Sequence, residues 1–176
     1  MLKITGLYKV FNPGTVNEKV ALKNISLHLE EGDFVTLIGG NGAGKSTLLN
    51  CVAGVYPADG GSIILDGKDI TKLPEHKRAA MLGRVFQDPM VGTAANMWLE
   101  ENLALAYRRG QRRTLKWGIT NKERQLYKEL LSRLDLGLEN RLSTKVGLLS
   151  GGQRQAVTLL MATLKKPKLL DRKSTR

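Results

Sequence analysis

The stretch Gly39-Gly40-Asn41-Gly42-Ala43-Gly44-Lys45-Ser46-Thr47 decides the fold of this chain. It fits the pattern G-x-x-x-x-G-K-[ST] of a phosphate-binding loop at every fixed position. Glycines let the backbone bend tightly around an anion, and the N–H groups of the following helix N-terminus then point at it. Lys45 would reach the β- and γ-phosphates, and the Ser46 hydroxyl would hold Mg²⁺. The stretch predicts a site for nucleotide phosphates.

The flanks of this loop predict a strand before it and a helix after it. Residues 34–38 form a short apolar run rich in strand formers. Residues 47–53 have a helical pattern, with Gly54 as the stop signal. The alternative is a glycine-rich turn that only happens to precede a helix. The Lys-Ser pair and the preceding strand favour the phosphate loop.

Length and charge set broad limits. The chain has 176 residues, which favours one domain, and a formal net charge of +12. Such a charge favours a polyanionic partner: nucleotide, anionic lipid surface or nucleic acid. A solvated basic surface is the alternative. Cys51 is the only cysteine, which suits a reducing cytosol, and we expect no signal peptide and no membrane-spanning helix.

Periodicity predicts strands early in the chain and helices later. The expected strands are residues 2–7, 25–29, 62–65 and 82–86, and the first of them suggest an antiparallel patch. From Trp98 onward the pattern is helical, with a capping box at Thr120 and a leucine face behind it. A basic run interrupts this helical part at Arg108, Arg109, Arg112, Arg113 and Lys116.

A second glycine motif, Leu149-Ser150-Gly151-Gly152-Gln153, precedes another amphipathic run. The spacing from Ser150 to Gln153 is that of a capping box, so even a structural interpretation gives a glycine-flanked helix N-terminus that suits an anion. The functional interpretation is a phosphate-binding site. The phosphate loop upstream favours the functional interpretation.

With these motifs the chain resembles the nucleotide-binding domain of ATP-binding cassette (ABC) transporters, nearest to the ATPase subunit of bacterial importers. Loop 39–47 matches that family's phosphate loop, and Leu149 to Gln153 match its signature. The resemblance implies that Gln87 contacts Mg²⁺ and the attacking water. It also implies that Phe11 stacks on adenine; Tyr8 is the alternative aromatic. Some relatives are linked to aromatic amino acids.

The resemblance implies an α/β P-loop NTPase (ABC ATPase) core with an N-terminal antiparallel β patch and a helical subdomain. Within residues 1–176 we expect the core at 1–95 and 148–171 and the helical subdomain at 96–147. It also implies ATP and Mg²⁺ as cofactors and a head-to-tail dimer that buries two ATP molecules. The implied partners are transmembrane permease subunits and a separate substrate-binding protein, which places the chain at the cytoplasmic face of the membrane. No specific nucleic-acid partner is expected.

The C-terminal end departs from the family pattern, in which an apolar strand ends in Asp-Glu. Here Leu169-Leu170 lead to Asp171-Arg172. Asp171 could serve as the Mg²⁺ ligand of a shortened strand, but Arg172 stands where the family has the Glu that orients water. We expect residues 172–176 to be a non-native tail of a core whose C-terminal part is missing; a genuine degenerate subunit is the alternative. Either way we expect ATP binding without hydrolysis.

Two other functions compete with the transporter ATPase. One is an ABC protein acting on nucleic acid or ribosomes, which the basic run favours. The segment between Gln87 and Leu149 is too short for the long coiled coils of DNA-repair relatives. The other is a GTPase or small-molecule kinase. A GTPase needs Asn-Lys-x-Asp, and Asn121-Lys122-Glu123-Arg124 has Arg at the deciding position.

Overall fold

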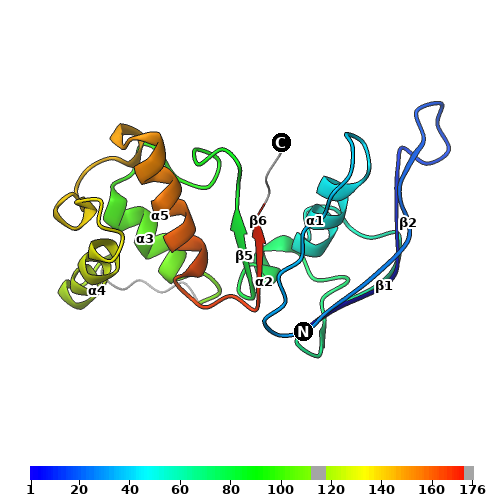
Figure 1. Cartoon of the computed structure of the whole chain (residues 1–176), viewed down its shortest axis with the longest axis horizontal. Helices are drawn as coiled ribbons and strands as arrows, with labels where there is room; N and C mark the ends of the chain where they lie inside the picture. Colours follow the sequence, from blue (N-terminus) through cyan, green and yellow to red (C-terminus); the bar gives the residue numbers. More distant parts are fainter. Residues whose placement is uncertain (112–117, 173–176) are drawn as a thin grey trace. The chain divides into compact units, whose positions relative to one another are not determined.

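The structure, a computed structural model, describes residues 1–111 and 118–172. The chain divides into two units, Met1–Leu82 and Gly83–Arg176. Figure 1 shows the strands of the first unit beside α1, and the second unit with the helices α3, α4 and α5. Each unit is described below by itself.

A four-stranded antiparallel sheet forms the body of the first unit. Its order is β2-β1-β3-β4, with β1 at Leu2–Phe11, β2 at Lys19–Leu29, β3 at Gly60–Leu65 and β4 at Lys68–Asp69. All three pairings are antiparallel. The predicted antiparallel patch is confirmed, and its first two strands are longer than the periodicity indicated because paired residues extend into the turn.

The core of the first unit lies between this sheet and helix α1 (Lys45–Ala53). Alternate residues of β1 point inward, as the period-two pattern requires. Most of its buried apolar side chains come from β1, β3 and α1, with Leu22 of β2 and Ile70 beside them: Leu2, Ile4, Leu7, Ile63, Leu65, Leu48, Cys51, Val52 and Ala53. The helix stops at Gly54, as predicted. This residue caps the C-terminal end of α1 in the left-handed conformation (φ 86°), which glycine adopts readily.

A buried arginine holds the C-terminal end of α1. Arg78 ends the short helix α2 (Glu75–Arg78) and is only 2% exposed. Its guanidinium donates to the carbonyl oxygens of Cys51 (2.7 Å) and Val52 (2.9 Å) in α1. Two further bonds reach Leu73 and Thr71. A cation at a helix C-terminus meets the negative end of the helix dipole, so this contact stabilises the helix that follows the phosphate loop.

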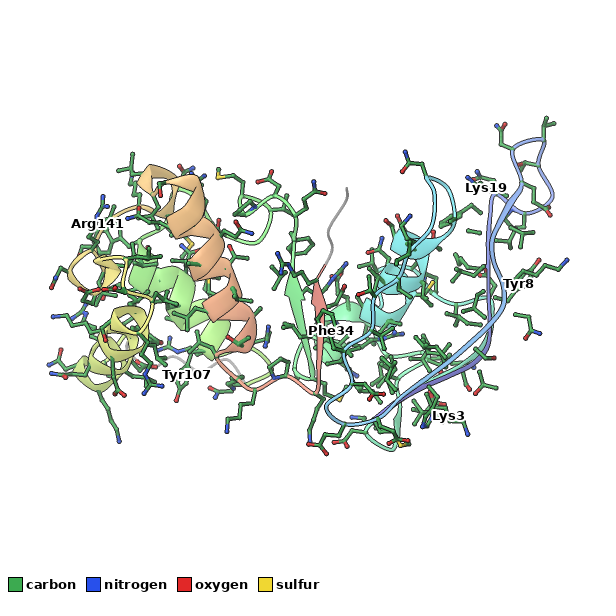
Figure 2. The ribbon with its side chains drawn as sticks, viewed as in Figure 1. Lys3, Tyr8, Lys19, Phe34, Tyr107 and Arg141 are labelled. Atoms are coloured by element: carbon green, nitrogen blue, oxygen red, sulfur yellow. The ribbon has the colours of Figure 1, made fainter. Side chains whose placement is uncertain are left out.

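The prediction of a strand at residues 34–38 is wrong. The described backbone there has no strand assignment, and Phe34 (labelled in Figure 2) is 93% and Ile38 91% exposed. A strand is stabilised by hydrogen bonds to a neighbour, and neither sheet includes these residues. The apolar run has the composition of a buried strand but no pairing partner in the described chain.

The second unit combines a small sheet with three helices. Strands β5 (Leu82–Val85) and β6 (Leu169–Arg172) pair with each other. The helices are α3 (Leu99–Tyr107), α4 (Asn121–Ser132) and α5 (Gly151–Thr163). Two 3₁₀ turns, at Leu138–Asn140 and Val146–Leu148, lie between α4 and α5. The predicted strand at 82–86 and the predicted helices are confirmed with small shifts of their ends.

One apolar cluster joins the three helices. Leu99 and Leu103 of α3 pack with Tyr127 and Leu131 of α4 and with Val157 of α5. The predicted leucine face of α4 is confirmed in part, since Leu131 is fully buried while its neighbours are partly buried. Among the described residues no helix is long and apolar enough to cross a bilayer.

Candidate nucleotide site

The phosphate loop leads directly into α1. Gly44 precedes the helix with φ 84°, and Gly42 has the same positive φ. The N–H of Ala43 donates to the carbonyl of Gly40 at 3.3 Å, and the N–H of Leu48 to that of Gly44 at 2.8 Å. These bonds close the turn and start the helix. The first-turn N–H groups of α1 have no partner within the helix and remain suited to an anion.

Lys45 extends back over this loop. Its ammonium donates to the carbonyl oxygen of Gly40 at 2.9 Å and to that of Gly39. The cation is therefore held among the loop carbonyls, within reach of a phosphate bound there. Ser46, the next residue, is exposed at the first turn of α1, so its hydroxyl is open to a metal ion. The predicted contacts of Lys45 with phosphate and of Ser46 with Mg²⁺ stay predictions.

The loop glycines serve two different purposes. A Cβ on Gly44 would lie 2.6 Å from the carbonyl oxygen of Ala21, so this glycine permits close packing of the loop on β2. A Cβ on Gly40 or Gly42 would meet nothing within 4 Å. Packing within the chain therefore leaves space at these two positions, as a loop that receives a ligand against its backbone requires.

The predicted base-stacking residue lies on the same unit as the loop. Phe11 ends β1 and is paired with Lys19 of β2, two residues before the Ala21 that contacts Gly44. Its ring is half-buried. Tyr8, labelled with Lys19 in Figure 2, lies farther along β1, where its Cβ faces Gly60 of β3. In the register, Ala21 lies opposite the stretch between Lys9 and Val10, so Phe11 and Tyr8 are at similar distances along β1 and the stacking role of Phe11 stays a prediction.

The second motif forms the N-terminus of α5. The N–H of Gln153 donates to the Ser150 hydroxyl oxygen at 3.2 Å, and the N–H of Ser150 donates to the Gln153 side-chain oxygen at 3.1 Å. This reciprocal pair is the capping box predicted from the sequence. A Cβ on Gly151 or Gly152 would meet nothing within 4 Å, while Leu149 anchors the motif in the core. The cap thus presents an open, positively polarised helix end.

Gln87 and Asp171 lie in the second unit with this motif. Gln87 is exposed just beyond β5. The Asp171 carboxylate in β6 forms an ion pair with Arg84 of β5 (Nε to Oδ2, 3.3 Å), and its side chain is only 9% exposed. The Mg²⁺ role of Asp171 stays a prediction.

The residues predicted to bind Mg²⁺ carry side-chain oxygens, the kind of ligand that Mg²⁺ prefers. Ser46 in the first unit and Gln87 in the second are both exposed residues. In the described ranges no group of three His, Cys, Asp or Glu residues could hold a metal. A nucleotide-bound Mg²⁺ usually takes most of its other oxygens from phosphates and water. The metal roles of Ser46, Gln87 and Asp171 stay predictions.

The basic run is partly structural. Arg108 forms an ion pair with Glu123 at 3.0 Å. Arg109 donates to the carbonyl oxygen of Ala162 at 3.3 Å, and burial lowers the pKa of its guanidinium. Arg108 and Arg109 therefore connect the segment after α3 with α4 and α5 in the second unit. The other three members, Arg112, Arg113 and Lys116, lie outside the described residues.

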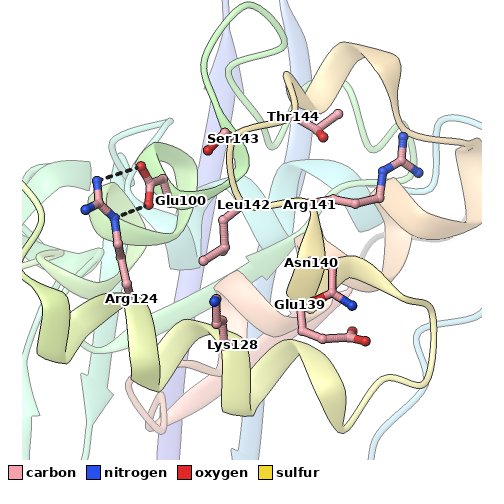
Figure 3. Close-up of a pocket in the computed structure, with 9 residues that line it drawn as sticks. All are labelled: Glu100, Arg124, Lys128, Glu139, Asn140, Arg141, Leu142, Ser143 and Thr144. Atoms are coloured by element: carbon pink, nitrogen blue, oxygen red, sulfur yellow. Dashed lines mark hydrogen bonds and ion pairs between the residues drawn. The ribbon is translucent and has the colours of Figure 1, made fainter.

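One cavity in the second unit is lined by none of the predicted site residues. Figure 3 shows this space of about 390 Å³ in the second unit, bounded on one side by Arg124 and Glu100. Their bidentate ion pair has N–O distances of 2.7 and 3.1 Å. Lys128 extends from α4 toward the loop at Leu142. That pair neutralises two of the charged side chains that line this cavity, and we assign the cavity no role in nucleotide binding.

Sequence reasoning missed the contacts that hold Phe11. Its ring meets Tyr56 edge to face, with ring centroids 5.3 Å apart and planes at 84°. Lys9 is buried two residues earlier in β1. Its ammonium lies over the Phe11 ring, 5.5 Å from the ring centroid, and forms an ion pair with the Asp59 carboxylate at 3.0 Å. These residues are far from Phe11 in the sequence, apart from Lys9, so no local pattern indicated them.

Residues 22–171 match the family described as ABC transporter. This chain belongs to the ABC transporter family. The match includes the phosphate loop, Gln87 and the signature motif, in the order in which they occur here. The geometry of the loop and of the α5 cap thus belongs to an ABC nucleotide-binding domain of the P-loop NTPase fold.

Named relatives agree with this assignment. The tyrosine transport ATP-binding protein of Clostridioides difficile (strain R20291) is 43% identical over 170 residues, which are 97% of this chain and 67% of that protein. The ATP-binding cassette MJ0796, in a dimeric post-hydrolysis state bound to ADP and Pi, is 27% identical with a TM-score of 0.78. That match covers 98% of this chain and 73% of the cassette. The cassette MJ1267 in its ADP conformation is 29% identical (TM-score 0.75; 97% and 66% covered).

Proposed function

We propose that this chain is the ATP-binding subunit that powers transport of a solute across a membrane, working as a head-to-tail dimer at the cytoplasmic face. The observation that carries the proposal is the position of the Lys45 ammonium among the carbonyls of the phosphate loop, beside an exposed Ser46. Lys45 binds the terminal phosphates, Ser46 and Gln87 hold Mg²⁺, and Phe11 stacks on adenine.

The signature motif supports the dimer. Each α5 N-terminus carries an open pair of glycines behind the Ser150 cap. In the proposed dimer this helix end of one copy faces the phosphate loop of the other, where its dipole stabilises the γ-phosphate. Two ATP molecules are then enclosed between the two copies. Binding of ATP closes the dimer, and release of the nucleotide opens it.

An apolar pocket supports docking on permease subunits. A pocket of about 320 Å³ in the second unit is lined by Trp98 and Leu105, both exposed, and by Ile119. Arg108 and Glu101 also line it. A lining that combines apolar and charged side chains suits a short amphipathic segment of a partner. We propose that a cytoplasmic loop of the permease binds here, with a separate substrate-binding protein delivering the solute.

The proposed solute is an aromatic amino acid. This rests on the 43% identity to a relative named for tyrosine transport. The solute contacts other subunits rather than this chain, so uptake of labelled tyrosine by the assembled transporter is the measurement that tests the assignment. Uptake of another amino acid class with no tyrosine uptake would contradict it.

Hydrolysis by this chain is proposed to be negligible. Arg172 follows Asp171 where the family has the Glu that orients water, and a guanidinium stays protonated and cannot act as a base. Asp171 itself is engaged with Arg84. The test is steady-state phosphate release by the purified chain, with Lys45→Ala as the control for contaminating ATPases. Lys45-dependent turnover would overturn this part of the proposal.

A further inference from the structure

The residues beyond the C-terminus of α1 are attached to the end of β1 that carries Phe11. The N–H of Asp59 donates to the carbonyl of Tyr8 at 3.0 Å. The Asp59 carboxylate accepts from the N–H of Val10 at 2.8 Å and from the Lys9 ammonium at 3.0 Å. Three hydrogen bonds thus fix the short segment that contains Tyr56 against this strand end.

The same segment is attached to the helix of the phosphate loop. The N–H groups of Val55 and Tyr56 both donate to the carbonyl of Asn50 in α1, at 2.9 and 3.3 Å. Tyr56 therefore has its backbone on the C-terminal end of α1 and its ring against Phe11 of β1. The helix that follows the phosphate loop is thus connected, through the segment beyond its C-terminus, to the Phe11 ring.

We propose that Tyr56, anchored by Asp59, is a positioning residue that fixes the Phe11 ring for stacking on the nucleotide base. This inference rests on the proposed function. A half-buried phenylalanine at a strand end that lacked ring contacts would sample several rotamers, and choosing one on binding would cost conformational entropy. The edge-to-face contact with Tyr56, together with Lys9 over the ring, selects one orientation in advance. Tyr56 needs no contact with the nucleotide for this effect.

The test separates base binding from phosphate binding. Affinities for Mg-ATP and for Mg-tripolyphosphate, which has the phosphates and no base, are measured by calorimetry in the parent chain, Tyr56→Ala, Tyr56→Phe and Phe11→Ala. We expect Tyr56→Ala to weaken ATP binding by roughly two- to tenfold, the range of an aromatic pair. Tripolyphosphate binding should not change, and Tyr56→Phe, which keeps the ring, should match the parent.

A double variant adds a readout that a general loss of structure would not give. In the Phe11→Ala background, Tyr56→Ala should have no further effect on ATP affinity, because the ring it positions is gone. Equal losses for ATP and tripolyphosphate in Tyr56→Ala, or additive losses in the double variant, would overturn the proposal. They would assign Tyr56 to the stability of the loop helix instead.

A measurement without nucleotide distinguishes failure of this inference from failure of the proposed function. Nuclear Overhauser contacts between the rings of Phe11 and Tyr56 in the free chain should be present in the parent and in Tyr56→Phe. Their absence overturns the positioning role even if ATP binds. Their presence together with no binding of ATP or tripolyphosphate by the parent overturns the proposed function, and the positioning role with it.

Discussion

The guanidinium of Arg78 donates to the carbonyl oxygen of Cys51 at 2.7 Å, across 27 positions of sequence. With Val52, Leu73 and Thr71, this makes four carbonyls that depend on one buried side chain. All four of these hydrogen bonds from the Arg78 guanidinium go to backbone carbonyl oxygens, and none goes to a carboxylate. Burial lowers the pKa of Arg78 accordingly, and the negative end of α1 supplies the compensation.

Arg78→Met should therefore destabilise the first unit by about 3 kcal/mol or more, because several buried carbonyls lose their donor at once. Arg78→Lys keeps the charge but cannot reach all four acceptors, and should fall between the parent and Arg78→Met. Urea unfolding followed by circular dichroism measures the loss. A change below about 1 kcal/mol in Arg78→Met would show that water or relaxation replaces these bonds.

Tyr127 should tolerate loss of its hydroxyl. The ring is fully buried in the helical cluster, and burial raises its pKa to about 12. Its hydroxyl oxygen has no hydrogen-bond partner within the described part of the chain. Removing an unsatisfied buried hydroxyl is neutral or favourable, so Tyr127→Phe should unfold at an equal or higher temperature. A drop of several degrees in calorimetry would indicate a bound water or an unseen partner. Tyr107, which meets the ring edge to face, provides the matched variant Tyr107→Phe.

Asp59 should make a pH-dependent contribution to stability. The hydrogen bond from the Val10 N–H, then the contact with Lys9, holds its pKa below the ordinary value. A carboxyl whose pKa is lowered by folding stabilises the protein above its unfolded pKa of about 4, and this is lost as pH falls through the folded value. Asp59→Asn should thus melt below the parent at pH 7, and the difference should shrink below pH 4. A difference that stays constant with pH would contradict the ionic role.

The described part of the basic run should act on stability rather than on nucleic-acid binding. Arg108→Ala removes an ion pair with Glu123 whose arginine side chain is partly exposed, and should cost at most about 1 kcal/mol. Binding of duplex DNA or RNA at physiological salt should be weak, without sequence preference, and little changed. Tight, sequence-selective binding that Arg108→Ala abolishes would favour the nucleic-acid function instead.

Local signals predicted the elements around the site well. The α5 cap follows from Ser150 and Gln153, three residues apart, and the end of α1 from Gly54. Both depend on hydrogen bonds within a few residues, which the sequence displays directly. The antiparallel patch followed from period-two alternation in the same way.

Features that depend on distant partners could not be predicted. Residues 34–38 have strand composition, yet strand formation depends on a neighbour that composition does not name. The ion pair between Asp171 and Arg84 joins residues far apart in the sequence, so no local pattern indicated it. The contact between Phe11 and Tyr56 likewise arises only when α1 and β1 are brought together.

Binding of Mg-ATP by loop 39–47 is tested most directly by isothermal titration calorimetry of the purified chain and of Lys45→Ala. We predict measurable, if weak, Mg-ATP binding by the parent and none by Lys45→Ala, because the variant loses the cationic phosphate contact. Circular dichroism spectra of the two chains should coincide, which excludes unfolding as the cause. Equal ATP affinity in the two chains, or no binding by a folded parent, would contradict the assignment of the phosphate loop.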